Sequence, residues 1–190
     1  MSSRDNILKR LREVEIAEVA KPQLDIIPIR FENKVTHFIK MVEAVGGNVV
    51  EMQGSLVETL ATLNIGVENL VSSLDELQNK ALNPDSVADV HELGGNYTAV
   101  VCGRVAVAEN GAVWIPILGK RKAHVFACNH LVVVMNREYI VDTMHDAIIQ
   151  LSLDNLAYGV FVSGPSKTAD IEQALVIGAH GAMQTTIILL

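Results

Sequence analysis

The residues best suited to chemistry lie near the C-terminus, between Ser163 and Gly181. A Gly164-Pro165-Ser166 turn follows an apolar run there, and a polar segment follows the turn. If a helix begins at this point, its free N–H groups and positive dipole end favour a phosphate or carboxylate, and Lys167 adds a full charge. The residues that we predict to form this anion site are Gly164, Ser166, Lys167, Thr168, Asp170 and Glu172.

Two other side chains could attack a carbonyl or carry a proton. Glu109 begins a Glu-Asn-Gly turn between two apolar runs, and an exposed glutamate on a rigid turn could form a covalent anhydride with an acyl group. An ordinary hairpin explains the same three residues. His180 lies in a Gly-Ala-His-Gly turn, where it could carry a proton or could simply be hydrogen-bonded within the turn. We predict Glu109 and His180 as catalytic candidates.

A third group lies in the segment AHVFACNH. On an extended strand, His124, Phe126, Cys128 and His130 would share one face. Strand residues at i and i+4 lie ~13 Å apart at the usual rise, so only Cys128 and His130 could chelate one zinc ion together. A half-buried sheet face explains the pattern equally well. We predict no metal site and leave the Cys128–His130 pair open.

The elements that must position these residues alternate between helices and strands. Apolar spacing and breakers predict helices over 3–14 (with Ser2 and Asp5 as a capping box), 32–45, 54–63, a short one opening at Asn83-Pro84, one capped by Asp142, and 169–177. Apolar and β-branched runs predict strands over 48–52, 67–71, 98–108, 112–117, 123–127, 130–135, 157–162 and 185–190.

This alternation, with short connections, predicts an α/β fold with parallel strands. Apolar residues make up 49% of the chain but aromatic residues only 4%, so the core must be aliphatic, as in strands covered on both faces. The length of 190 residues suits one domain.

Charge and composition exclude several classes of function. The net charge of −7 argues against nucleic-acid binding, and the one basic cluster, 120–122, is only three residues long. No signal peptide is recognisable, and no apolar run reaches the roughly 18 residues of a membrane span. Cys102 and Cys128 form no CxxC motif, so we expect a cytoplasmic protein without a disulfide framework.

The run SGPSKTADIEQALVIGAHG, followed by an aliphatic strand, resembles the signature that ends LUD-domain proteins, in particular the lactate-utilization protein C group. The segment VAVAENGAVWI is similar to the stretch of that family in which an Ala-Glu-x-Gly turn precedes a strand. There are departures: Lys167 stands where the family commonly has Arg, Asn110 where it has Thr or Ser, and Ala182 where it has Pro.

The resemblance implies a three-layer Rossmann-like sheet of the NagB/RpiA/CoA-transferase-like type. It implies a single LUD domain over residues 1–190, with an N-terminal helical arm at about 1–20. It also implies a subunit of a cytoplasmic iron–sulfur-dependent system that oxidises L-lactate to pyruvate. Two cysteines fall short of the four thiolates that a cluster needs, so we expect no cofactor on this chain and iron–sulfur clusters in partner subunits.

Other expectations follow from the same resemblance and from the candidate site. The ligand would be a small organic acid or another anion, and an oligomer is possible. The alternative is a stand-alone CoA-transferase-like or sugar-phosphate isomerase-like enzyme that uses Glu109 and the 163–168 loop. A third reading is a regulatory or scaffold module that keeps the fold without chemistry.

Overall fold

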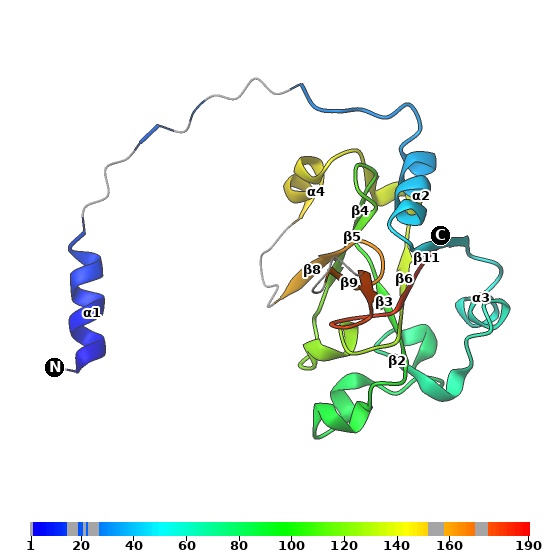
Figure 1. Ribbon diagram of the computed structural model, residues 1–190. Helices are drawn as coiled ribbons and strands as arrows, with labels where there is room; N and C mark the ends of the chain where they lie inside the picture. Colours follow the sequence, from blue (N-terminus) through cyan, green and yellow to red (C-terminus); the bar gives the residue numbers. More distant parts are fainter. Residues whose placement is uncertain (1, 15–18, 21, 23–26, 152–157, 170–174) are drawn as a thin grey trace.

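The computed structural model describes residues 2–14, 19–20, 22, 27–151, 158–169 and 175–190 (Figure 1). The α-helices of these residues are α1 (Ser3–Arg12), α2 (Lys34–Ala44), α3 (Leu56–Thr62) and α4 (Met144–Gln150). Shorter 3-10 turns cover Val67–Asn69, Asp75–Leu77, Pro84–Ser86, Val90–Leu93, Lys122–Val125 and Arg137–Tyr139.

The central sheet has five parallel strands in the order β1-β11-β6-β3-β2. Their bounds are β1 Asn48–Glu51, β2 Leu70–Ser72, β3 Thr98–Cys102, β6 His130–Met135 and β11 Gln184–Leu189. The valines of β6 are buried and this strand pairs with a neighbour on each side, as expected for a strand covered on both faces. The predicted parallel sheet is confirmed.

A second sheet of four strands has the order β7-β4-β5-β8. Its strands are β4 Val105–Val107, β5 Ala112–Pro116, β7 Ile140–Val141 and β8 Gly159–Val162. The predicted strand 98–108 is therefore divided, because β3 belongs to the central sheet and β4 to the second. Gly103 lies where the chain passes from β3 to β4. Neighbouring side chains are so close there that an added Cβ would lie 2.4 Å from Val113 Cγ1 and 3.1 Å from Met135 Sδ, so the position needs a glycine.

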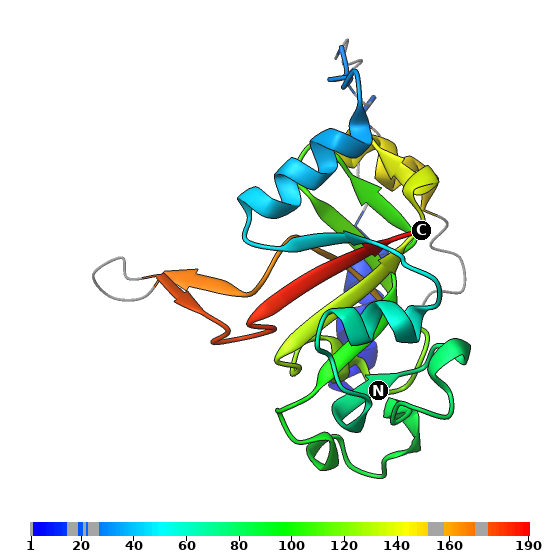
Figure 2. The same ribbon diagram turned by 90° about the vertical axis from the view of Figure 1, so that its right-hand side faces the viewer.

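Three apolar clusters hold the layers together. One lies between the central sheet, the second sheet and α2, where Phe38 and Val42 are buried. Another joins the opposite face of the central sheet to Leu56 and Leu60 of α3, and a third joins the second sheet to Ala147 of α4. Figure 2 shows the central strands between α2 above and α3 below. The predicted layered α/β architecture is confirmed, with the second sheet as an addition to one layer.

The helix predicted over 169–177 is wrong. Its first residue ends strand β9 (Lys167–Ala169) and its last residues form β10 (Leu175–Ile177), and the two strands pair antiparallel. The pairing places Thr168 opposite Val176, so cross-strand contact between β-branched residues outweighs the local helical pattern.

Two further local predictions are wrong. Residues 123–127 form no strand, because Phe126 N and Ala127 N both donate to Ala123 O within a helical turn. The N-cap of α4 is Thr143 and not Asp142, because Thr143 exchanges hydrogen bonds with Asp146 in a capping box.

Helix α1 begins as predicted, with Ser2 and Asp5 in a reciprocal capping box. None of its residues is buried, and in Figure 1 it lies apart from the sheets. No helix among the described ranges combines the length and the apolar character needed to cross a membrane.

Candidate functional site

The turn that carries Glu109 joins β4 to β5 and is attached to the end of β7. Ala108 N donates to Val141 O over 2.8 Å, and Glu109 N donates to Asp142 O over 2.9 Å. Gly111 has a φ of +67°, and an added Cβ would lie 2.9 Å from Val42 N of α2. Glycine is therefore required at position 111 both by its backbone angle and by the close approach of α2.

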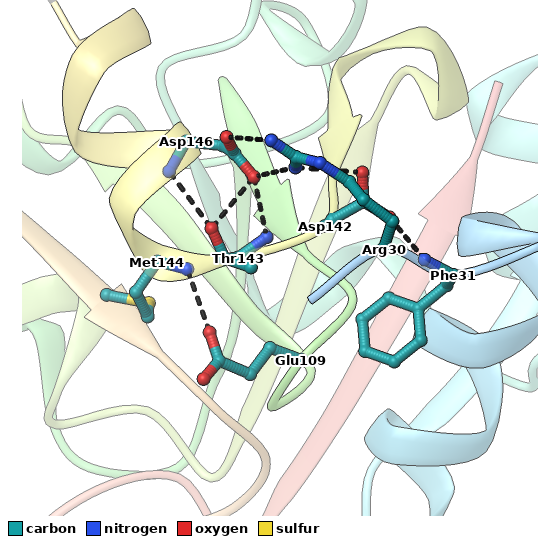
Figure 3. A network of polar contacts seen from close by, with 7 residues as sticks. All are labelled: Arg30, Phe31, Glu109, Asp142, Thr143, Met144 and Asp146. Atoms are coloured by element: carbon teal, nitrogen blue, oxygen red, sulfur yellow. Dashed lines mark hydrogen bonds and ion pairs between the residues drawn. The ribbon is translucent and has the colours of Figure 1, made fainter. Parts of the chain in front are cut away.

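The carboxylate of Glu109 points to the beginning of α4 (Figure 3). Its Oε2 accepts a hydrogen bond from Met144 N over 3.0 Å, while the side chains of Thr143 and Asp146 complete the capping box of the same helix. Glu109 thus satisfies one of the N–H groups that a helix leaves free at its N-terminus. The side chain remains exposed.

Arg30 ties the segment before α2 to the same helix end. Its guanidinium donates to both carboxylate oxygens of Asp146, over 2.5 and 3.2 Å, and to Asp142 over 3.2 Å. Asp142 also accepts from Phe31 N over 3.0 Å. The hydrogen bond from Arg30 lowers the pKa of Asp146 to about 2, with Thr143 as the next contributor. Arg30 is therefore already committed to two carboxylates.

These groups line a cavity of about 430 Å³. Its walls combine apolar side chains of 27–29 and Ile149 with Arg30, Glu109, Thr143, His145 and Asp146. Arg30 binds the carboxylates of Asp142 and Asp146, and a third carboxylate, that of Glu109, lines the same cavity. The local charge therefore disfavours an anionic ligand, while an oxygen of Glu109 and the imidazole of His145 remain as groups that can exchange protons.

The Gly164-Pro165-Ser166 loop lies at the carboxyl end of α2, and not at the start of a helix. Gly164 has a φ of +68°, and an added Cβ would lie 2.7 Å from Val45 O. The ammonium of Lys167 donates to that same carbonyl oxygen. Lys167 thus lies at the negative end of a helix dipole. The helix start predicted after this loop is wrong, because strand β9 follows it, whereas anion binding by the loop stays a prediction.

The structure brings part of the predicted site together. Ser163 Oγ donates to Asn110 O over 2.8 Å, so the loop and the Glu109 turn lie side by side. Ser166 binds the 178–182 turn through its backbone, donating to Ala182 O over 2.8 Å and accepting from Gly178 N over 2.9 Å.

The remaining predicted site residues lie elsewhere. His180 is exposed in the turn after β10, and no hydrogen bond between described residues joins it to Glu109. Thr168 lies on β9 in the hairpin. Asp170 and Glu172 lie outside the described residues.

The thiol and imidazole groups considered for zinc are engaged within the protein. Cys128 donates its S–H to Val125 O, and burial raises its pKa to about 11. His130 Nε2 is 2.9 Å from Thr186 Oγ1, and burial lowers the pKa of this imidazole. Across the described ranges, no three His, Cys, Asp or Glu side chains gather in a metal-sized group. A neutral buried thiol does not suit a zinc ligand.

Of the residues that bind one another around the start of α4, Glu109 alone was predicted as a site residue. The Thr143-x-x-Asp146 spacing is a capping-box pattern and could have identified this helix start. Arg30 has no such local signal, because its partners lie more than 110 positions further along the chain.

A family model described as the LUD domain matches residues 73–190. None of the curated proteins matches. Among solved structures, a DUF162 family protein from Deinococcus radiodurans is similar, with a TM-score of 0.65 and 12% sequence identity. That match covers 85% of this chain and 99% of the other, and at this identity it shows a shared fold.

Proposed function

The chain belongs to the LUD-domain family, and from this premise we propose that it is a subunit of a cytoplasmic iron–sulfur-dependent system that oxidises L-lactate to pyruvate. The observation that carries the proposal is the family match over residues 73–190. That range contains both segments, 105–115 and 163–181, that resemble the lactate-utilization protein C group.

The cysteines of this chain do not fit an iron–sulfur cluster. A cluster is held by several thiolates, whereas the chain has two cysteines. Burial raises the pKa of both thiols, and Cys128 is fully inside the core. We therefore assign the clusters of the proposed system to partner subunits.

The charge of the Glu109 cavity supports an accessory role for this chain. Lactate and pyruvate are carboxylates, whereas two carboxylates of the protein already bind Arg30 and a third, Glu109, lines the same cavity. The ammonium of Lys167 donates to the end of α2, and Lys167 is not among the described residues that line this cavity. We propose that oxidation takes place with the participation of partner residues.

Affinity purification from L-lactate-grown cells under anaerobic conditions tests this proposal. We expect a cysteine-rich partner to co-purify and to carry the iron. The matched control is the double variant Cys102→Ser, Cys128→Ala, whose complex should keep its full iron content. Absence of an iron–sulfur partner, together with normal growth on L-lactate after gene deletion, would overturn the proposal.

Glu109 supports a second candidate, acyl transfer from a CoA thioester. The specific observation is that Glu109 is exposed at a cavity with one oxygen held by Met144 N. In this reaction a carboxylate oxygen of Glu109 would attack the thioester carbonyl, the C–S bond would break, and the CoA thiolate would leave behind a mixed anhydride. The acidic surroundings oppose the approach of a CoA ester, so this candidate ranks second.

Turnover of acyl-CoA by the purified chain separates the two candidates. Acyl transfer requires that Glu109→Gln abolish turnover and that Glu43→Gln, an exposed glutamate of α2, leave it intact. Absence of turnover in the unmodified chain, or unchanged turnover in Glu109→Gln, would exclude this candidate.

A further inference from the structure

A second cavity lies outside the carboxyl ends of the central strands, next to Gln150 and Leu151 at the C-terminal end of α4. It has a volume of about 570 Å³ and is bordered by Cys102 at the end of β3, Asn136 after β6 and Leu190 after β11. In open α/β sheets, ligands characteristically occupy the crevice outside the carboxyl ends of the strands. The volume falls within the range of small-molecule sites.

Two side chains of this cavity, Arg104 and Asn136, offer hydrogen-bond donors. Arg104 lines it, and the guanidinium of Arg104 makes no ion pair or side-chain hydrogen bond with any described residue. Asn136 uses its Oδ1 to accept from Glu138 N over 2.9 Å, which leaves its amide N–H groups free. Among the described residues, no Asp or Glu side chain lines this cavity. A ligand that carries acceptor oxygens and a negative charge matches the donor groups of Arg104 and Asn136.

Two aromatic rings line the same cavity. Tyr139 is 53% exposed. Trp114 is fixed from behind by Phe161, whose ring centroid lies 4.8 Å away, and by Gly159, where an added Cβ would lie 2.2 Å from Trp114 Cζ2. The indole of Trp114 is held in place and the phenol of Tyr139 is exposed, so both can stack on a planar ring of a ligand. Such stacking requires a rigid aromatic face and few specific polar contacts.

We propose that this cavity binds an anion that carries a planar ring, of the size of a nucleoside monophosphate. The phosphate binds the guanidinium of Arg104, and the base packs against Trp114 and Tyr139. The cavity differs from that around Glu109, where carboxylates outnumber the cation. The proposal does not depend on lactate or on a partner subunit, so it is tested on the purified chain alone.

Trp114 provides a direct measurement, because it is the single tryptophan of the chain. Tryptophan fluorescence is titrated with AMP and with flavin mononucleotide as the probes. Adenosine, which has the ring without the anion, and inorganic phosphate, which has the anion without the ring, are the comparison ligands. We expect saturable quenching by at least one mononucleotide, with affinity at least about tenfold higher than for adenosine or phosphate.

Variants assign the binding to this cavity. Arg104→Gln should weaken mononucleotide binding by about tenfold and leave adenosine binding unchanged. Tyr139→Leu should weaken both, and Arg12→Gln in α1 should change neither. Arg104 and Tyr139 are exposed, so thermal unfolding is expected to confirm that both variants fold normally. The proposal is overturned if neither mononucleotide quenches Trp114, or if Arg104→Gln binds as tightly as the unmodified chain.

Discussion

At the scale of single residues, the contacts of Glu109, Arg30 and Asp146 stabilise the start of α4. Glu109 and Asp146 accept hydrogen bonds from backbone N–H groups at the N-terminus of α4, and Arg30 binds the segment before α2 to the same helix end. Glu109 was recognised in the sequence through its Glu-Asn-Gly turn, and the Thr-x-x-Asp spacing could have identified Asp146 as well. The partners of Arg30 could not be predicted, because their contact depends on how β7 and the segment before α2 meet in space.

The low pKa of Asp146 predicts a change of stability with pH. Because folding lowers this pKa to about 2, the stabilisation is complete above the unfolded value of about 4 and is lost as the pH falls toward 2. We expect Asp146→Asn to reduce the free energy of unfolding by about 1 kcal/mol at pH 6, and by much less near pH 2. Urea unfolding at the two pH values measures this, with Asp75→Asn as the control. An equal loss at both would contradict the role of the carboxylate.

The two thiols should differ in reactivity. Cys102 is exposed, whereas Cys128 is buried and its pKa is raised to about 11. Because the thiolate is the reactive form, we expect one thiol per native chain to react with Ellman's reagent and the second only after unfolding. Cys102→Ser should remove the native reaction. Two rapidly reacting thiols in the folded protein would contradict the burial of Cys128.

At the scale of elements, capping residues and apolar spacing located α2, α3 and most strands. The predictions failed where a non-local contact decided the conformation. Residues 167–169 and 175–177 pair with each other in a hairpin, although their segment has a helical pattern. The segment 123–127 is rich in apolar residues, but Tyr97 donates to His124 O and helps to hold it as a turn.

The contact between the 164–166 loop and α2 is tested by two glycines with the same backbone angle. Gly164 and Gly94 have φ values of +68° and +67°, but an added Cβ meets Val45 O at Gly164 and nothing within 4 Å at Gly94. We expect Gly94→Ala to cost about 1 kcal/mol and Gly164→Ala about 1–3 kcal/mol more. Chemical denaturation measures both. Equal costs would show that the loop does not press against α2.

At the scale of the whole molecule, the described chain has one layered body and a peripheral helix. The composition, with many apolar but few aromatic residues, predicted a sheet whose two faces are both covered by aliphatic side chains. The second sheet could not be predicted, because its strand β4 forms one continuous run in the sequence with β3 of the central sheet. The single domain over residues 1–190 stays a prediction.

Helix α1 should contribute little to the stability of the body. None of its residues is buried, so deletion of residues 2–14 should change the melting temperature by about 1 °C or less. Differential scanning calorimetry of the full-length and shortened chains makes the comparison. A decrease of several degrees would show that α1 packs on the body.

We propose that this LUD-domain chain acts in L-lactate oxidation without a cluster of its own. In a reconstitution experiment, L-lactate oxidation is measured with the purified chain alone, with the iron-bearing partner alone, and with both. We expect full activity with both together, and the same activity when the chain carries Cys102→Ser and Cys128→Ala. Lactate oxidation by the chain alone, or loss of iron from the complex in the cysteine variant, would contradict it.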